Sequence, residues 1–207
     1  MLGLYTGMRR EEILGLCWDC VHLDHKAPFV EVKRALRWEN SRPVVSEVLK
    51  SDAAQRSIPI PANLAEYLTE RQQPEGYVVG GEPLSQTQFK NLWRLVENRM
   101  VGEKTYVVPY SPSRERVTFI REKGAKSRGG NFRYTIDFPV SPHILRHTYI
   151  TNLILSGADL KTVQYLAGHA NIKITLDIYT HLTDRSPEKL IEQVNKAFEV
   201  KSEVKSK

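Results

Sequence analysis

The stretch His143-Ile144-Leu145-Arg146-His147 decides how this sequence is interpreted. Ser141-Pro142 starts a predicted helix around it, because serine caps helices and proline is tolerated at their first position. On that helix His143, Arg146 and His147 lie on one side, about one turn apart. Two imidazoles and a guanidinium on one side are uncommon in a core, where unpaired charge is expensive. The alternative is an exposed helix face on which Arg146 pairs with a carboxylate.

Further polar residues accompany this cluster in four other segments. In chain order they are Thr6-Gly7-Met8-Arg9-Arg10-Glu11-Glu12, Lys50 before Arg56-Ser57-Ile58-Pro59, Leu166-Ala167-Gly168-His169 and Ile178-Tyr179-Thr180-His181. Gly168 ends a predicted helix that Asp159 caps, and Tyr179 lies on a short helix predicted over 171–181. Taken singly none is specific, since a lone tyrosine is more often core or surface than nucleophile.

Together and in this order, the segments resemble the tyrosine recombinases of the phage-integrase family, over about residues 2–198. We expect one catalytic domain over residues 1–200 and a disordered tail over 201–207. Compared with the family, the chain is expected to lack an N-terminal DNA-clamping domain and the first helices of the catalytic domain. The resemblance implies that the catalytic residues are Arg9, Lys50, His143, Arg146, His169 and Tyr179, with Glu12 in support.

The chemistry explains these residue types. Cleavage of a phosphodiester by a tyrosine adds negative charge to the non-bridging oxygens, and Arg9 and Arg146 can clamp these oxygens with forked hydrogen bonds. Such preorganised charge would stand in for metal ions, so no metal or other cofactor is expected. Tyr179, with an ordinary pKa of about 10, needs the guanidiniums to stabilise its phenolate, and His143 is the expected proton acceptor or positioning group.

The resemblance assigns the remaining roles. Lys50 would protonate the leaving 5′ oxygen, His169 would donate to a non-bridging oxygen, and Glu12 would orient the arginine site. The implied product is a 3′-phosphotyrosine bond with a free 5′-hydroxyl. That bond keeps the phosphodiester energy, so strands can be rejoined without ATP or metal.

Composition limits the class of protein. The chain has 207 residues, with 30 Lys and Arg against 24 Asp and Glu, and its net charge of +6 weakly favours an anionic partner. No apolar run approaches the roughly 18–20 residues of a membrane span, and two cysteines cannot form a disulfide framework. We therefore expect a cytoplasmic protein without a membrane partner. The resemblance implies a bacterial or phage-encoded origin, double-stranded DNA as partner and a homotetramer on that DNA.

The expected fold class is α+β and mostly α-helical. Short apolar runs predict a three-stranded antiparallel meander over residues 29–32, 44–49 and 58–60. Further helices are predicted over Arg9–Leu16, over Pro61–Arg71, from a capping box at Ser85–Gln88 to Met100, and from Ser186 onward. The last of these is amphipathic and packs either on its own domain or into a neighbouring subunit.

Residues 102–138 are predicted to form a basic β-hairpin or long loop around Gly129-Gly130. Two roles stay open for it: a solvated surface excursion, or an arm that follows DNA phosphates. In the second role the residues that contact DNA are Arg121, Lys123, Lys126 and Arg128.

Three other functions fit parts of the sequence. A type IB topoisomerase shares the same catalytic residue types, although the short spacing from Gly168-His169 to Tyr179 favours a recombinase. A DNA-binding fragment that no longer reacts would keep the basic surface. A zinc-binding module is the third, because close cysteines and histidines can chelate zinc; the simpler interpretation is reduced thiols and surface histidines at Cys17, Cys20, His22 and His25.

Overall fold

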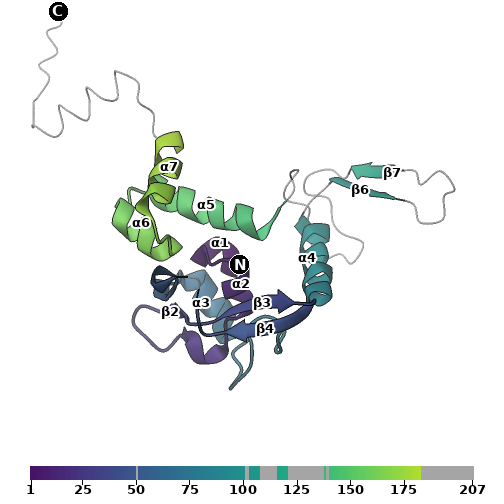
Figure 1. Cartoon of the computed structure of the whole chain (residues 1–207), viewed down its shortest axis with the longest axis horizontal. Helices are drawn as coiled ribbons and strands as arrows, with labels where there is room; N and C mark the ends of the chain where they lie inside the picture. The colour runs from purple at the N-terminus through teal and green to yellow at the C-terminus, as the bar shows by residue number, and fades with distance from the viewer. Residues whose placement is uncertain (50, 101–102, 108–115, 121–137, 139, 183–207) are drawn as a thin grey trace, which may run out of the picture.

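The computed structural model describes residues 1–49, 51–100, 103–107, 116–120, 138 and 140–182. In this part of the chain, helices combine with small antiparallel sheets, so the predicted α+β fold class is confirmed (Figure 1). None of the described helices is long and apolar enough to cross a membrane.

The first described helix packs on the group of helices formed by the last three. α1 (Leu2–Thr6) lies against α5 (Pro142–Leu155), and α6 (Leu160–Ala167) and α7 (Ile172–Leu182) pack on α5 and on each other (Figure 1). The predicted caps are confirmed. At the start of α5, Ser141 Oγ accepts from the Ile144 N–H at 3.2 Å, and at the start of α6, Asp159 Oδ1 accepts from the N–H groups of Lys161 and Thr162. A buried cluster joins α5 to α6 and comprises Tyr149, Ile150, Ile154, Val163 and Ala167.

The predicted break at Thr6-Gly7 is also confirmed. Gly7 joins α1 to α2 (Arg10–Leu14) with a φ of 60°, in the left-handed region that favours glycine. The ring of Tyr149 on α5 packs directly on Gly7, where no side chain would fit. This turn therefore brings the start of α2 close to α5. α2 is shorter than the helix predicted over 9–16.

The predicted meander is wrong in its middle strand. The three-stranded sheet is antiparallel, in the order β1 (Val21–His22), β2 (Phe29–Val32), β5 (Arg56–Pro59). The predicted middle strand instead contributes to β4 (Arg42–Ser46), which pairs with β3 (Ala35–Glu39) in a separate hairpin. The missed signal is the two-residue turn Asn40-Ser41, whose φ values of 49° and 65° are those that a type I′ hairpin requires.

The larger core lies beneath the three-stranded sheet. It contains the short 3-10 helix η1 (Trp18–Cys20) and α3 (Ala62–Thr69), whose Leu64 and Leu68 are buried as their spacing predicts. Val30 and Ile58, which face each other across β2 and β5, are fully buried in it. This core supports β5 and therefore the residue at its start, Arg56.

α4 (Gln86–Met100) begins with the predicted capping box. The Ser85 N–H donates to Gln88 Oε1 at 2.8 Å, and the Gln88 N–H donates to Ser85 Oγ at 3.4 Å. Trp38 of β3 contacts Phe89, with ring centroids 5.6 Å apart, and its Nε1 donates to a carbonyl just before the helix. These contacts hold α4 beside the β3–β4 hairpin.

The strands β6 (Glu103–Val107) and β7 (Arg116–Ile120) pair antiparallel beyond α4 (Figure 1). A hairpin is therefore present within residues 102–138, but residues 108–115 connect its strands, so the predicted turn at Gly129-Gly130 is wrong for this strand pair; those two glycines lie outside the described residues. Several predictions lie outside the described residues: the last amphipathic helix, the tail over 201–207, Lys50, and the four candidate DNA contacts Arg121, Lys123, Lys126 and Arg128.

Candidate active site

Three arginine side chains converge on the C-terminal turn of α6 from distant parts of the chain. Consecutive carbonyls accept from them: that of Leu166 from Arg56 Nε at 2.9 Å, that of Ala167 from Arg146 Nη2, and that of Gly168 from Arg9 Nη2 at 2.7 Å. Carbonyls at a helix C-terminus lack partners within the helix, and the helix dipole makes this end negative. The end of α6 therefore holds three guanidiniums side by side.

Arg146 is buried, with 6% of its surface exposed. α5 places it between the α1–α2 turn and the end of α6, and its Nη1 also donates to the Gly7 carbonyl at 2.6 Å. Burial, together with the charges of Arg9 and Arg56, lowers the pKa of Arg146 to about 10. The guanidinium therefore still carries its charge at neutral pH.

Arg9 and Glu12 form a pair at the start of α2. Glu12 accepts from the Arg9 backbone N–H at 2.8 Å and from Arg9 Nη1 at 2.7 Å. The Glu12 side chain is 3% exposed and that of Arg9 is 36% exposed, so Glu12 supports Arg9 from beneath. Burial opposes ionisation of Glu12, but the hydrogen bonds and charges of Arg56 and Arg9 outweigh it and lower its pKa.

Arg56 belongs to the same cluster, and the sequence reasoning did not place it among the site residues. Its fully buried side chain donates to both oxygens of Glu12, at 3.2 Å and 2.9 Å. Strand alternation carries the signal that could have found it, because Arg56 shares the buried face of β5 with Ile58. We call Arg9, Glu12, Arg56 and Arg146 the arginine cluster. Among the described residues the guanidiniums of Arg9 and Arg56 hydrogen-bond to the one carboxylate of the cluster, and that of Arg146 to carbonyls, so the excess positive charge favours an anionic ligand.

His169 lies directly after Gly168, whose φ of 64° ends α6. The imidazole is buried, and its Nδ1 lies 3.0 Å from Thr175 Oγ1. Burial, and then the charges of Arg146 and Arg9, lower the pKa of His169 to about 4, so the ring is neutral at pH 7. In the tautomer in which the Thr175 hydroxyl donates to Nδ1, Nε2 carries the proton and can donate to an anion.

His143 and His147 are exposed on α5. Their Nε2 atoms lie 2.9 Å apart and their ring centroids 4.4 Å apart, so the predicted alignment of the two imidazoles is confirmed. Burial, His143 and Arg146 lower the pKa of His147. The lowered pKa favours the neutral form of His147, which lies against the candidate proton acceptor His143.

Tyr179 lies on α7, which packs on α5 and α6. Its side chain is half-buried and packs against the cluster that includes Tyr149 and Val163. The structure thus gathers Arg9, Glu12, Arg146 and His169 around the end of α6 and places Tyr179 on the adjoining helix. Lys50 would follow β4 and precede the 3-10 helix η2 (Asp52–Ala54), but it lies outside the described residues.

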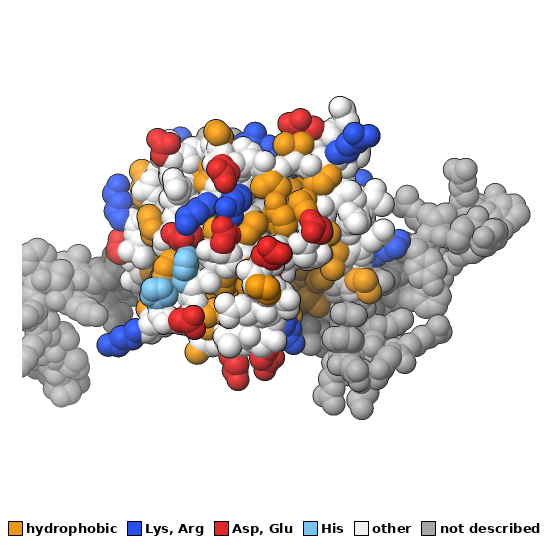
Figure 2. Space-filling model, turned by 90° about the horizontal axis from the view of Figure 1, so that it is seen from below, with side chains coloured by type: hydrophobic (Ala, Val, Ile, Leu, Met, Phe, Trp, Pro, Cys, Tyr) orange, Lys and Arg blue, Asp and Glu red, His pale blue; other side chains and the backbone are white. Residues whose placement is uncertain are grey.

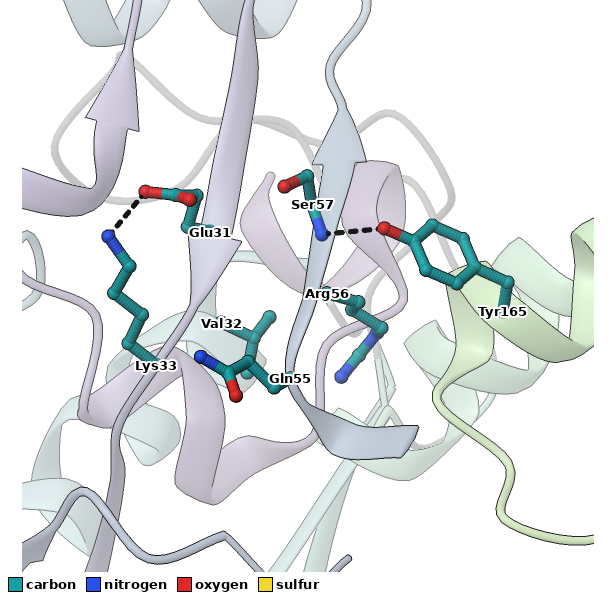
Figure 3. A pocket seen from close by; sticks show the side chains of 7 residues that line it. All are labelled: Glu31, Val32, Lys33, Gln55, Arg56, Ser57 and Tyr165. Atoms are coloured by element: carbon teal, nitrogen blue, oxygen red, sulfur yellow. Dashed lines mark hydrogen bonds and ion pairs between the residues drawn. The ribbon is translucent and has the colours of Figure 1, made fainter. Parts of the chain in front are cut away.

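A pocket opens beside Arg56 (Figure 3). Polar groups of its lining pair with one another: the backbone N–H of Ser57 donates to the Tyr165 hydroxyl at 3.1 Å, and Lys33 Nζ lies 2.6 Å from Glu31 Oε2. The first of these contacts joins β5 to α6. The pocket walls therefore connect the two elements that carry Arg56 and the carbonyls of the arginine cluster.

The zinc interpretation gains no support from this structure. Within the described residues, no three His, Cys, Asp or Glu side chains are placed to hold a metal ion. Burial raises the pKa of the Cys20 thiol to about 11 and also raises that of Cys17, so both groups are protonated thiols at neutral pH. His22 instead contacts Glu31 at 2.8 Å and stacks on Phe29.

The structure is an α+β domain with three guanidiniums gathered at one helix end, beside a tyrosine-bearing helix. The family model described as the phage integrase family matches residues 1–186. The chain therefore belongs to the phage integrase family.

Individual relatives agree with this assignment. A tyrosine recombinase XerC-like protein of Caldanaerobacter subterraneus subsp. tengcongensis is 26% identical over 209 residues, which cover 96% of this chain and 48% of the relative. Tyrosine recombinase XerD of Brucella suis is 44% identical over 79 residues, 38% of this chain and 24% of the relative. The chain thus spans about half the length of the first relative.

Solved structures share the fold. The Tn1549 transposon integrase in complex with transposon right end DNA matches with a TM-score of 0.62 and 18% identity, over 95% of this chain and 57% of that chain. The crystal structure of XerA recombinase matches with a TM-score of 0.50 and 18% identity, over 97% of this chain and 55% of that chain.

Proposed function

We propose that this chain is the catalytic domain of a site-specific DNA recombinase that cleaves and rejoins strands through Tyr179. The arginine cluster carries the proposal, because three guanidiniums with one hydrogen-bonded carboxylate call for an anion. A phosphodiester is an anion that two guanidiniums can clamp through its non-bridging oxygens. Relatives named tyrosine recombinases, and an integrase solved with transposon DNA, support DNA as the substrate.

Arg9 and Arg146 hold the non-bridging oxygens in this proposal. Some N–H groups of each guanidinium donate to protein oxygens. Arg146 donates to the carbonyls of Gly7 and Ala167, and Arg9 donates to Glu12 and to the Gly168 carbonyl. Their remaining N–H groups donate to no residue that the structure describes. Because protein oxygens fix both guanidiniums, the positive charge is preorganised for the transition state and needs little rearrangement during the reaction.

The covalent step uses the groups around this anion site. The Tyr179 oxygen attacks phosphorus, and the bond from phosphorus to the 5′ oxygen breaks. His143 takes or positions the phenol proton, Lys50 protonates the leaving 5′ oxygen, and His169 donates to a non-bridging oxygen. The 3′-phosphotyrosine bond that results is opened by the 5′-hydroxyl of another strand, so rejoining needs no ATP. The two guanidiniums supply the charge that metal ions supply elsewhere, and we expect activity in EDTA.

Strand exchange brings two duplexes together, so we propose a homotetramer on double-stranded DNA. The four basic residues Arg121, Lys123, Lys126 and Arg128 contact phosphates in this assembly. The face shown in Figure 2 offers no comparable basic surface, because acidic, basic and apolar side chains are interspersed on it.

Covalent trapping tests the proposal. The protein is incubated in EDTA with nicked suicide duplexes, or with supercoiled plasmids that carry random inserts, and adducts are separated on a denaturing gel. The wild type is expected to form an EDTA-resistant adduct that Tyr179→Phe abolishes. Tyr67→Phe, which alters a 40% exposed tyrosine of α3, is the matched control and keeps the adduct.

Three other outcomes would overturn parts of the proposal. Relaxed plasmid without exchange between molecules would favour a topoisomerase. Salt-sensitive DNA binding without any adduct would leave an unreactive DNA-binding fragment. An adduct that survives in Tyr179→Phe would mean that another residue is the nucleophile.

A further inference from the structure

Arg56 is a buried residue that ties together segments from three parts of the chain. Its side chain is 0% exposed, so it is shielded from solvent and from any surface that DNA approaches. Besides its bonds to Glu12, it donates from Nη1 to the Ala54 carbonyl at 2.8 Å and from Nε to the Leu166 carbonyl at 2.9 Å. Its partners thus lie in α2, in η2 and in the last turn of α6.

The contact with Glu12 reaches Arg9. Arg56 approaches the Glu12 carboxylate with both terminal nitrogens, at 3.2 Å and 2.9 Å. Each of these two oxygens also accepts from Arg9, one from its guanidinium and the other from its backbone N–H. Any displacement of Arg56 therefore moves the carboxylate that orients Arg9.

The contact with Leu166 sets the end of α6. The guanidinium packs so closely on Gly168 that a Cβ there would lie 2.7 Å from Arg56 Nη1. The next two carbonyls of this turn hold Arg146 and Arg9, and His169 follows directly. Through the Ala54 carbonyl, Arg56 also fixes η2, the segment that follows position 50.

We infer that Arg56 is a positioning residue of the active site, which sets the spacing of Arg9, Arg146 and His169 through Glu12 and the last turn of α6. The inference rests on the proposed function. A guanidinium is required because one flat group donates four hydrogen bonds to three protein groups, which an ammonium cannot reproduce. Small displacements of catalytic groups cost large factors in rate, so Arg56 affects chemistry without touching DNA.

A double-mutant cycle on single-turnover cleavage of the suicide duplex tests this inference. Arg56→Lys is expected to cleave about 10²-fold more slowly than wild type, with DNA affinity changed by less than about threefold. In the background of Arg9→Lys the same change is expected to cost less than about tenfold, because the group that Arg56 positions is already impaired. A merely structural role would give equal factors in both backgrounds and would overturn the inference.

Arg34→Lys is the matched control. Arg34 also makes a two-pronged ion pair, with Asp19 at 2.9 Å for each bond. Within the described residues, none of its hydrogen bonds reaches the arginine cluster. It is expected to cleave at the wild-type rate. If Arg56→Lys fails to fold, as judged by circular dichroism, Glu12→Gln replaces it in the same cycle with the same expectation. If the wild type cleaves and Arg56→Lys cleaves equally fast, the inference about Arg56 is refuted and the proposed function stands. If the wild type forms no adduct, the proposed function is refuted.

Discussion

The arginine cluster and the side of the site that carries His143, His147 and Tyr179 hold their polar groups in opposite ways. Arg56 and Arg146 are buried, and carbonyl oxygens and Glu12 fix their guanidiniums. The two histidines are exposed on α5, and Tyr179 is half-buried on α7. The guanidiniums are thus held by several protein oxygens, whereas the groups that would accept a proton or attack lie closer to the surface.

This difference follows from what each group must do. A guanidinium stabilises a transition state best when it is already in place, and the helix C-terminus beneath it provides oxygens at no cost in rearrangement. A nucleophile and a proton acceptor must reach DNA, so burial would disable them. Substitutions that disturb the arginine cluster should therefore affect both the rigidity of the site and the cleavage rate. Substitutions of the exposed histidines or of Tyr179 should affect the cleavage rate alone.

Arg146→Lys tests the rigid half most severely. Lysine keeps the charge but cannot reach the carbonyls of Gly7 and Ala167 together, as the planar guanidinium does. Single-turnover cleavage of the suicide duplex is expected to fall about 10³-fold, with DNA affinity within about threefold of wild type. A loss smaller than tenfold would show that charge alone suffices and that the fork is dispensable.

His143→Gln tests the accessible half. Cleavage is expected to fall about 10²-fold, because a group that accepts or positions a proton is lost. The melting temperature should stay within about 2 °C of wild type, since the residue is exposed. His147→Gln serves as the comparison, with a loss of less than about tenfold, because it only removes a partner at 2.9 Å from His143. Equal losses would mean that the two imidazoles act as one unit.

Gly7→Ala tests how the rigid half is built. A Cβ at Gly7 would overlap the Tyr149 ring, and the φ of 60° adds strain, so the free energy of unfolding should fall by about 3 kcal/mol. Gly157→Ala is the matched control: its φ is 84°, but a Cβ there would meet no atom within 4 Å. For Gly157→Ala we expect the free energy of unfolding, measured in urea, to fall by about 1 kcal/mol. Equal losses would contradict the importance of the Gly7–Tyr149 contact.

The stability of the site near His169 should depend on pH. Because the pKa of folded His169 is lowered to about 4, the unfolded chain binds more protons between about pH 4 and 6.5, and stability falls as the pH drops through this range. Wild type should lose about 2–3 kcal/mol more than His169→Gln between pH 7 and 4.5 in urea unfolding. Parallel curves for the two proteins would show that His169 titrates normally.

Local sequence signals predicted much of this fold. The caps at Ser141, Ser85 and Asp159 and the breaks at Gly7 and Gly168 were all identifiable, because side-chain oxygens and left-handed glycines act within a few residues. The β3–β4 hairpin was missed because Asn40-Ser41 is a turn that lacks glycine. Strand pairing is decided at long range, and apolar runs alone do not specify which strands are neighbours.

The candidate site was predictable only in part. The resemblance named Arg9, Glu12, Arg146 and His169, and the structure gathers them around one turn of α6. Arg56 was not predicted as a site residue, because an arginine in a short strand is usually exposed. Its partners Glu12 and Leu166 also lie 44 and 110 residues away in the sequence. The roles of Lys50 and Tyr179 stay predictions.

In the proposed reaction the fixed arginine cluster directs a phosphodiester to Tyr179. The most direct measurement is mass spectrometry of the trapped adduct, after nucleases trim the DNA and trypsin cuts the protein. We expect the nucleotide phosphate on the peptide that contains Tyr179. Attachment to any of the other tyrosines among the nine in the chain would mean that Tyr179 is not the nucleophile.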